Sequence, residues 1–551
     1  MRILLPNFQF EDTLRNPSFR PGGQTVAALE DLASTMAVLA DPDDRVLLPT
    51  SRQPQGLPDW LACDQFVNAE QQPAPGRLVP WGWTQDCRRW DDGQSPAPPE
   101  QICVHRVNSR EFLALHDRVW LMDGGWQEQP FGRFCRTQSE WGEVIRRLSS
   151  DSSRWCAKPQ YSHAGRNRLL GHRTSLNDQQ LGWRNRQLQA GGVYLEPWRE
   201  VLQEWSLHFD VMPCGDVDLI GATELINDEM GRYAGNLVCS PEELQLPDEV
   251  LISVRELAWQ CGQAGYWGPV GLDGFRFCDA NGNTGIRICN DINARYSMGR
   301  LALAGRRLCQ PTDRVLWCQI RTAAADASKQ DSEFSDPSET ARMLLATYDL
   351  DGVCITRVSP LAMGSRPVRT ATLLLSGDCI NQLKTAQRTL REQLAQQVID
   401  LGRQKDLQVA TAESCTGGLI SGALTEVSGS SAVVDRGFVT YSNEAKAELL
   451  NVPMETINSK GAVSATVARA MVTGALANSR AQVAVAVTGV AGPTGGTPQK
   501  PVGLVYIAAQ SLDGLVSVKE CRFADQGAST RAQVRQMTVE TALQMLIDEM
   551  S

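Results

Sequence analysis

The sequence AESCTGG at residues 412–418 follows a strand-like apolar run at 407–410 and begins a stretch of small and polar residues. A second glycine-rich sequence, TGVAGPTGG at 488–496, follows the apolar run 483–487 in the same way. Such junctions are typical of a buried strand that ends in a backbone-exposing loop. Two of them in one α/β domain predict a phosphate cradle with a hydroxyl nucleophile beside it.

The residues around these junctions alternate between strand-like and helix-like segments. Strands are expected near 407–411, 434–441, 483–489 and 503–510. Helices are expected near 416–426, 443–451, 464–478 and 529–547, and an amphipathic helix at 381–401 opens the domain. The alternation predicts a three-layer α/β domain.

Length and composition predict several domains. The chain has 551 residues, which is too many for one core. All 14 tryptophans lie between Trp60 and Trp317, and all five histidines between His105 and His208, so the end of the chain contains neither residue type. We expect an α/β lobe at 1–100, a second domain at 101–380 with a polar loop near 324–339, and a third domain at 381–551.

Charge and hydropathy exclude several function classes. A net charge of −10 without a Lys/Arg-rich stripe argues against a nucleic-acid partner. No apolar run reaches the length of a membrane span, and the N-terminus lacks the features of a signal peptide, so we expect a cytoplasmic protein with no membrane contact. The 16 cysteines are dispersed, which predicts reduced thiols.

Ser414 is the candidate nucleophile at the first junction. Thr416, Gly417 and Gly418 open the next helix, whose N-terminal N–H groups suit a phosphate or an oxyanion. The alternative is that Ser414 and Thr416 only cap this helix. No histidine follows His208, so a base from this domain must be a lysine or a carboxylate.

Lys446, in TYSNEAK at 440–446, is the candidate base. A lysine kept neutral by burial can take the proton of a serine, although a solvated lysine on a helix surface is the simpler alternative. Tyr441 either orients Lys446, contacts the substrate, or is an ordinary strand aromatic.

The second loop supplies further candidates. Thr488 and Gly489 lie at its start, where glycine allows the backbone to approach a ligand. Lys500 is a candidate phosphate ligand. Only eight of the 53 basic residues are lysine, so two lysines near these loops are suggestive.

Several motifs occur in order between residues 412 and 503: AESCTGGLISGALTEVSGSS, DRGFVTYSNEAK, GAVS, AVAVTGVAGPTGG and KPVG. Together they resemble the C-terminal domain of the competence-damage-inducible protein A family, which is similar to nicotinamide-nucleotide amidases, over roughly residues 385–550. The resemblance implies hydrolysis of nicotinamide mononucleotide to nicotinic acid mononucleotide and ammonia. It also implies that no cofactor is required and that copies associate as homo-oligomers.

The resemblance also implies roles for individual residues. Ser414 would be the nucleophile and Lys446 its base, while Tyr441 and Thr488 would help to place the amide. Phosphate contacts are implied for Thr416, Gly417 and Gly418, and Arg531 and Arg535 would reach either the ligand or a neighbouring subunit. Ala465 after GAVS departs from the glutamate usual in relatives, and the molybdopterin-binding-like domain that often precedes this module is not recognisable.

A second group of motifs lies in the first two thirds of the chain. WCAKPQYSHAGRNRLLG at 155–171 places Lys158 at a strand end, before a loop of small residues. GLDGFRF at 271–277 and RICNDINAR at 287–295 place Asp273 and Asp291 on successive strands. Asn293 lies two residues beyond Asp291 and so on the same strand face, where both can bind a hard cation. The alternative is ordinary turn chemistry.

This set resembles the ATP-grasp fold of carboxylate-amine ligases over roughly residues 100–395. The resemblance implies that Lys158 contacts ATP phosphates, that Glu196 lies near the adenine hinge, and that Asp273, Asp291 and Asn293 hold Mg²⁺. No lysine precedes Lys158, so either an arginine such as Arg118 replaces an earlier phosphate-binding lysine of the family or the site is weakened.

The leading hypothesis is therefore a multidomain α/β enzyme, with an ATP-grasp-like N-terminal region followed by a three-layer α/β amidase-like domain. In a second hypothesis the ligase is the enzyme and the C-terminal domain is an accessory that binds a nucleotide without hydrolysing it. A purely structural scaffold is the third hypothesis.

Overall fold

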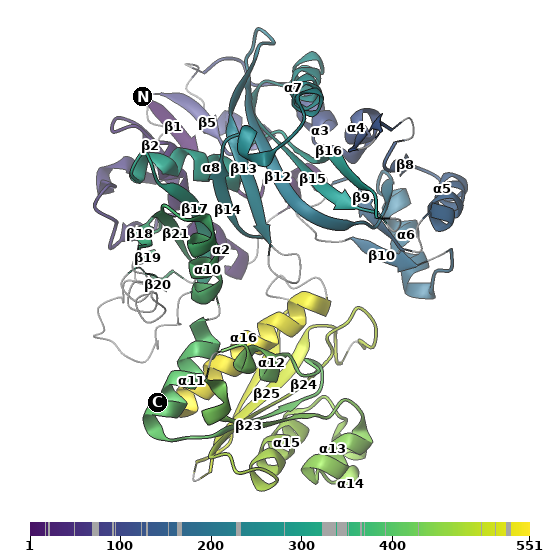
Figure 1. Cartoon of the computed structure of the whole chain (residues 1–551), viewed down its shortest axis with the longest axis vertical. Coiled ribbons are helices and arrows are strands. Elements are labelled where there is room, and N and C mark those ends of the chain that lie inside the picture. The colour runs from purple at the N-terminus through teal and green to yellow at the C-terminus, as the bar shows by residue number, and fades with distance from the viewer. Residues whose placement is uncertain are drawn as a thin grey trace. The chain divides into compact units, whose positions relative to one another are not determined.

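The computed structural model divides the chain into two compact units, Met1–Gln387 and Arg388–Ser551 (Figure 1). Both contain helices and strands, which confirms the multidomain α/β class. The predicted polar loop at 324–339 lies, apart from residue 338, outside the described residues. The structure describes residues 1–550 except 17, 20–22, 49, 69–75, 91–92, 94, 123, 128–129, 152–153, 162–167, 173, 228–232, 280–281, 322–337, 339–349, 351, 364–365, 369, 392, 428, 498, 513 and 525–530.

Unit 1 begins with a four-stranded parallel sheet, of order β4-β2-β1-β5. Its strands are β1 (Arg2–Leu5), β2 (Arg45–Leu48), β4 (Phe66–Asn68) and β5 (Arg77–Pro80). Between β1 and β2 lies α2 (Gly23–Ala33), which continues as a 3₁₀ helix over Ser34–Leu39.

A ten-stranded antiparallel sheet forms the centre of unit 1, in the order β18-β21-β17-β14-β13-β12-β15-β16-β6-β7. Its strands are β6 (Val119–Leu121), β7 (Gly125–Trp126), β12 (Glu200–Val211), β13 (Val217–Asn227), β14 (Tyr233–Cys239), β15 (Gly268–Cys278), β16 (Thr284–Asn293), β17 (Arg314–Arg321), β18 (Cys354–Arg357) and β21 (Thr370–Gly377). Helix α7 (Asp248–Gln263) packs on β12 and β15, and α8 (Met298–Gly305) packs on β13 and β14.

A second, four-stranded antiparallel sheet follows the order β10-β9-β11-β8. It consists of β8 (Arg133–Cys135), β9 (Arg154–Pro159), β10 (Leu169–His172) and β11 (Val193–Pro197), with α5 (Gln138–Asp151) and α6 (Asp178–Gln189) against it. Strand β11 is followed after two residues by β12 of the larger sheet. This junction sets the candidate site of unit 1 between the two sheets.

Smaller elements complete unit 1. They are α1 (Phe10–Arg15), α3 (Gln101–Val107), α4 (Arg110–His116), β3 (Pro54–Gln55), β19 (Ala362–Met363) and β20 (Arg366–Pro367).

The single helix expected at 381–401 is two helices, α10 (Ile380–Arg391) and α11 (Gln393–Lys405). Their apolar residues serve different cores. In α10, Leu383 and Ala386 are buried and Gln387 donates to the Ala234 carbonyl of unit 1 at 3.1 Å. In α11, Val398 belongs to the core of unit 2. The continuous periodicity therefore concealed the boundary between the two units.

Unit 2 contains a five-stranded sheet of order β23-β22-β24-β25-β26. The strands are β22 (Val409–Glu413), β23 (Val434–Val439), β24 (Val483–Gly489), β25 (Leu504–Ser511) and β26 (Ser517–Arg522). The first three are parallel, whereas β25 and β26 run antiparallel to their neighbours. Strand β26 was not predicted from the sequence.

Helices cover both faces of this sheet, as the three-layer prediction requires (Figure 1). They are α11, α12 (Leu419–Thr425) and α16 (Arg531–Met550) in one core, and α13 (Asn443–Leu450), α14 (Met454–Lys460) and α15 (Ala465–Ala477) in the other. The side chains of β22 alternate between the two cores. Val409 packs in the first core, whereas the smaller Ala410 and Ala412 face the second, because successive strand residues point to opposite faces.

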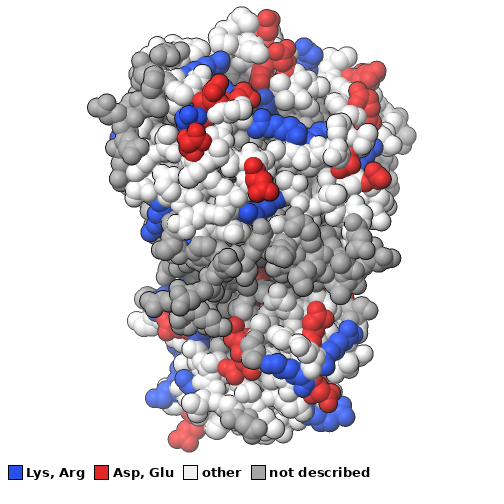
Figure 2. All heavy atoms as spheres, turned by 90° about the vertical axis from the view of Figure 1, so that its left-hand side faces the viewer, with Lys and Arg blue, Asp and Glu red and all other residues white. Residues whose placement is uncertain are grey.

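The face in Figure 2 carries acidic and basic side chains interspersed, with no basic stripe among its described residues. Within the described part of the chain, no helix is both long and apolar enough to cross a membrane.

Candidate active site

Ser414 lies at the point where two parallel strands of unit 2 end. It follows β22, and its N–H donates to the Val487 carbonyl of the neighbouring β24 at 3.1 Å. Its side chain is buried beneath the turn that leads to α12. The pairing of β22 with β24 therefore brings the two sequence junctions together.

Lys446 projects from α13 to the same point. Its Nζ lies 3.0 Å from Ser414 Oγ, 2.9 Å from the Thr440 carbonyl oxygen and 3.4 Å from the Ser442 carbonyl oxygen. The side chain is 1% exposed, and this burial lowers the pKa of the amine from its ordinary value. Lys446 is thus a buried neighbour of the nucleophile and not a solvated surface residue.

The three contacts of Lys446 suit a general base. In the neutral amine, two N–H bonds can donate to the carbonyls of Thr440 and Ser442, which leaves the lone pair for the Ser414 hydroxyl. Tyr441 does not provide this orientation. Its side chain is 63% exposed and its hydroxyl accepts a hydrogen bond from Arg531 at 3.0 Å.

The helix N-terminus after Ser414 is not an open phosphate cradle. The buried carboxylate of Glu413 accepts from the N–H groups of Gly418, Ile420 and Ser421 at 2.9, 3.0 and 2.8 Å. The expectation that this helix end binds a phosphate is therefore corrected, because a side chain of the protein already occupies it. Gly417 and Gly418 have φ of 61° and 96°, a region that favours glycine.

Two arginines from the start of α16 border this turn. Arg535 donates to the Thr416 carbonyl, and Arg531 donates to the Gly492 carbonyl at 3.0 Å as well as to Tyr441. The Nε of Arg535 and the Oγ1 of Thr416 are buried and have no hydrogen-bond partner among the described residues. Of the basic pair expected from the sequence, Arg535 therefore contacts the turn that carries Ser414 and has an unpartnered Nε, whereas Arg531 binds the second glycine-rich loop and Tyr441.

The remaining predicted residues of unit 2 have other partners. Thr488 is buried and donates its hydroxyl to the Ala462 carbonyl at 2.8 Å. At Gly489, a Cβ would lie 2.6 Å from a methyl group of Val505, so glycine is needed for close strand packing. Lys500 donates to the Lys460 carbonyl at 3.1 Å, at the end of α14. This contact gives no support to Lys500 as a phosphate ligand.

In unit 1, Lys158 and Glu196 meet in a buried polar cluster. The Lys158 amine lies 2.7 Å from Glu196 and donates to Asn290 at 2.9 Å. Arg287 donates to the same two residues at 2.7 and 2.9 Å. Burial opposes ionisation of Glu196, but the charges of Lys158 and Arg287 lower its pKa to about 2.

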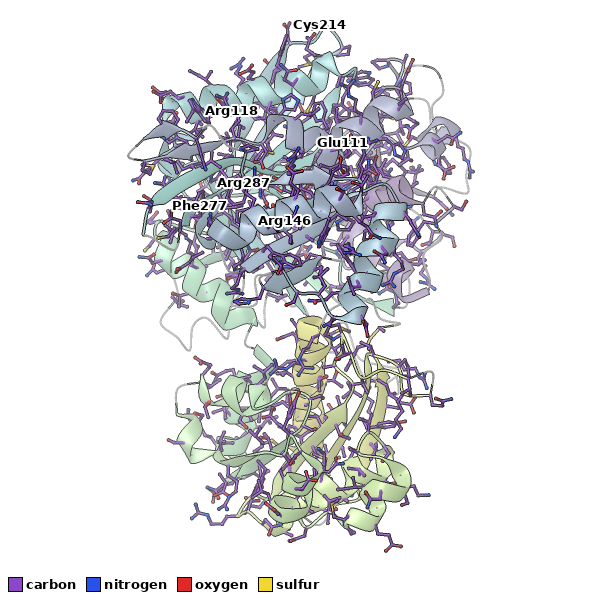
Figure 3. All side chains as sticks on the ribbon, turned by 90° about the vertical axis from the view of Figure 1, so that its right-hand side faces the viewer. Glu111, Arg118, Arg146, Cys214, Phe277 and Arg287 are labelled. Atoms are coloured by element: carbon purple, nitrogen blue, oxygen red, sulfur yellow. The ribbon has the colours of Figure 1, made fainter. Side chains whose placement is uncertain are left out.

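Arg287 is the centre of this cluster and was not predicted (Figure 3). It is wholly buried, and its Nε and one terminal nitrogen donate to Asp117 at 3.0 and 3.2 Å. The latter nitrogen also donates to the Tyr194 hydroxyl at 2.9 Å. With Glu196 and Asn290, these contacts use all five N–H donors of the guanidinium. Arg118, expected as the phosphate ligand, instead lies over the Trp126 ring at 4.2 Å.

The predicted cation site contains two facing carboxylates. Asp273 on β15 and Asp291 on β16 are direct cross-strand partners, and Arg110 lies 3.4 Å from Asp291. Burial and the neighbouring Asp291 raise the pKa of Asp273 to about 7. The two carboxylates fit Mg²⁺, which prefers oxygen ligands. Asn293 does not present a free oxygen, because it donates to Asp273 and accepts from Arg295.

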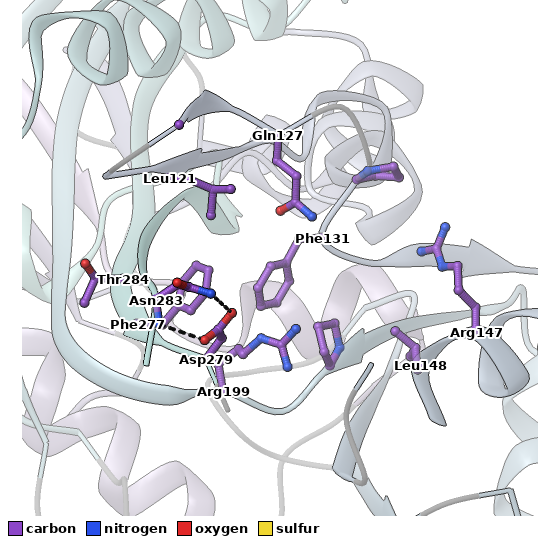
Figure 4. A pocket seen from close by; sticks show the side chains of 13 residues that line it. Leu121, Gln127, Phe131, Arg147, Leu148, Arg199, Phe277, Asp279, Asn283 and Thr284 are labelled. Atoms are coloured by element: carbon purple, nitrogen blue, oxygen red, sulfur yellow. Dashed lines mark hydrogen bonds between the residues drawn. The ribbon is translucent and has the colours of Figure 1, made fainter. Parts of the chain in front are cut away.

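A pocket of about 470 Å³ lies beside the Arg287 cluster (Figure 4). Phe131 forms part of its wall and stacks on Arg287, with the guanidinium carbon 4.5 Å from the ring centre. Pro197 and Arg199, which follow Glu196, also line the pocket, as does Phe277. The pocket therefore borders the segment where the sequence predicted a nucleotide base.

Comparisons with known proteins concern mainly unit 2. A family model described as "CinA C-terminal domain" matches residues 391–550. The nicotinamide-nucleotide amidohydrolase PncC of Enterobacter agglomerans is 48% identical over 26% of this chain and 85% of its own length. Three other curated relatives are covered by this chain over only 37%, 49% and 35% of their own length.

Two solved structures are similar to parts of this chain. The competence/damage inducible protein CihA of Agrobacterium tumefaciens is 54% identical, with a TM-score of 0.28, over 29% of this chain and 94% of that one. The N5-carboxyaminoimidazole synthetase of Staphylococcus aureus is 11% identical, with a TM-score of 0.40, over 71% of this chain and 96% of that one.

Proposed function

The chain belongs to the CinA C-terminal domain family through residues 391–550, and from this premise we propose that unit 2 hydrolyses the amide of nicotinamide mononucleotide. The products would be nicotinic acid mononucleotide and ammonia. The observation that carries the proposal is the 3.0 Å contact between Ser414 Oγ and the buried amine of Lys446. A relative named as a nicotinamide-nucleotide amidohydrolase, matched over most of its length, supports the choice of substrate.

The contacts suggest how the residues act. Burial lowers the pKa of Lys446 and so favours its neutral form, which takes the proton of Ser414 as Oγ attacks the amide carbon. The protonated lysine then gives this proton to the leaving nitrogen, which departs as ammonia. Water attacks the resulting ester, Lys446 again takes up a proton, and the carboxylic acid leaves as Ser414 is regenerated.

Arg531 and Arg535 are proposed to bind the phosphate of the nucleotide. Arg535 donates to the Thr416 carbonyl of the Ser414 turn, and Arg531 donates to the Gly492 carbonyl of the second glycine-rich loop. A phosphate could accept from the unpartnered Nε of Arg535 and from the Thr416 hydroxyl. This assignment replaces the helix N-terminus, which Glu413 occupies.

Ammonia release from nicotinamide mononucleotide tests this function. We expect the wild-type protein to release ammonia and Ser414→Ala to lose at least about 10³-fold in kcat. Full activity in Ser414→Ala would show that the serine is not the nucleophile. No release by the wild type, together with binding of the nucleotide, would favour a non-hydrolysing accessory domain.

For unit 1 we propose an ATP site with Mg²⁺, in a ligase that joins a carboxylate to an amine. Lys158 and Glu196 from the small sheet meet Asn290 of the large sheet, next to the carboxylates of Asp291 and Asp273. Such a cluster can bind phosphates through the lysine amine and a hard cation through the carboxylates. Asp273 and Asp291 would hold Mg²⁺, which would neutralise phosphate charge when bound.

Titration of the protein with ATP, with and without Mg²⁺, tests this second function. We expect binding that Lys158→Ala weakens by at least about tenfold, because a charge-assisted contact is lost. Binding that is unchanged in Lys158→Ala would place the nucleotide elsewhere.

A further inference from the structure

Glu413, the last residue of β22, has no part in the chemistry proposed above, yet it is one of the most completely bonded side chains of unit 2. It is wholly buried. One carboxylate oxygen accepts from the N–H groups of Gly418 and Ile420. The other accepts from the N–H and hydroxyl of Ser421 at 2.8 and 2.9 Å, and from Thr411 at 3.3 Å.

The charge of this carboxylate is balanced by a helix end. No lysine or arginine among the described residues forms an ion pair with Glu413. Its partners are the first N–H groups of α12, which carry partial positive charge, and two hydroxyls. The side chain therefore holds the turn 414–418 against the helix that follows it.

The backbone of Glu413 contacts the segment that holds Lys446, the second residue of the Ser414–Lys446 pair. The Glu413 carbonyl accepts from the Thr440 N–H at 2.8 Å, and the Thr440 carbonyl accepts from Lys446 Nζ at 2.9 Å. Glu413 thus contacts the turn that carries Ser414 through its side chain and the segment that holds Lys446 through its backbone.

We propose that Glu413 is a positioning residue, which sets the 3.0 Å separation between Ser414 Oγ and Lys446 Nζ. This role rests on the proposed amidase function. The chemistry requires the two atoms at hydrogen-bond distance, and a displacement of about 1 Å can reduce a rate about 10²-fold. A carboxylate is needed because backbone N–H groups, which can only donate, face both of its oxygens.

Glu413→Gln isolates this requirement, because it keeps the size of the side chain. Whichever way the amide is oriented, its NH₂ group faces backbone N–H donors, either those of Gly418 and Ile420 or that of Ser421. The turn must then shift. We expect kcat to fall about 10²-fold, while KM, set at the arginines of α16, changes less than about threefold.

A fluorophosphonate probe supplies a second readout that does not depend on the substrate. Ser414 Oγ would attack phosphorus and displace fluoride, and the rate of labelling measures how well the serine is activated. The matched control is Glu426→Gln, the same substitution at the exposed end of α12, which should label at the wild-type rate. Thermal midpoints show whether each variant is folded.

The outcomes separate the two proposals. A wild type that is labelled at Ser414 but releases no ammonia refutes the substrate, and the labelling rates still test Glu413. A Glu413→Gln protein that labels within twofold of the wild type overturns the positioning role. If Glu413→Gln does not fold, Glu413→Asp replaces it. The aspartate side chain is shorter by one methylene, so its carboxylate should lie farther from the turn and labelling should again be slower. An unchanged labelling rate overturns the proposal. A wild type with neither labelling nor ammonia release refutes both.

Discussion

Replacement of Arg287 by methionine should destabilise unit 1 severely. The side chain is wholly buried and donates to Asp117, Glu196, Asn290 and Tyr194. Methionine has similar length but no donor, so these groups lose their shared partner. The perturbation therefore tests whether the cluster is a cooperative unit or a set of weak contacts.

The size of the loss in the free energy of unfolding follows from the contacts that Glu196 and Asp117 keep after the substitution. Glu196 keeps Lys158 at 2.7 Å, so its charge stays paired. Asp117 keeps only neutral donors, the Tyr194 hydroxyl and the Gly132 N–H. One uncompensated buried carboxylate corresponds to a loss of about 3–5 kcal/mol in the free energy of unfolding. Burial already raises the pKa of Asp117, so the variant should regain stability as the pH falls and this carboxyl takes up a proton.

Urea denaturation followed by tryptophan fluorescence measures this loss. All 14 tryptophans lie within unit 1, so the signal does not report the unfolding of unit 2. Arg118→Met is the matched control, because Arg118 is exposed and stacks on Trp126; its loss should be at most about 1 kcal/mol.

A loss below about 1 kcal/mol in Arg287→Met would refute the reasoning, because the cluster would then behave like a surface ion pair. Adding Asp117→Asn to Arg287→Met removes the orphaned charge and should restore at least about 1 kcal/mol. A double variant that is less stable than the single one would equally contradict the assignment of the cost to Asp117.

Three further predictions concern unit 2. Because the base must be neutral and burial lowers the pKa of Lys446, kcat/KM should rise with pH through a midpoint below 10.5; a flat profile would exclude Lys446. Lys446→Arg should lose about 10²–10⁴-fold in kcat, since arginine cannot be deprotonated; ammonia release measures this loss. Arg535→Ala should raise KM for the nucleotide at least about tenfold. Lys500→Ala should leave KM within about twofold, because the Lys500 amine binds the Lys460 carbonyl. The reverse pattern would indicate that the phosphate binds at the second loop.

The sequence alone was sufficient for most of unit 2. Strands β22, β24 and β25 are short apolar runs bounded by glycine or polar residues. This local pattern identifies them as strands without knowledge of the strands with which they pair. The absence of histidine left a lysine or a carboxylate as the base, and the resemblance to the family implied Lys446, whose amine lies 3.0 Å from Ser414 Oγ. The boundary of the unit was missed because α10 and α11 share one helical period while their apolar residues enter different cores.

The groups that hold the sites in place were harder to predict. Arg287 alternates with buried Ile286 and Ile288, a pattern that suggests a solvated face of the strand. Its partners Asp117 and Glu196 are distant in sequence, so only the folded chain shows that this face is covered. One signal was available: residues 287 and 291 fall on the same strand face, which carries the predicted Mg²⁺ ligand Asp291.

Helix α16 brings its arginines to a nucleophile more than a hundred residues earlier in the chain, and this separation has a kinetic consequence. The contact of Lys446 with Ser414 involves no atom of α16, whereas Arg531 and Arg535 reach the site only while this helix is docked. Transient undocking would leave an activated serine without selectivity for anions. Small uncharged amides and esters would then be hydrolysed, and both this hydrolysis and hydrogen exchange in α16 would slow as nucleotide is added, because the nucleotide binds only while the helix is docked.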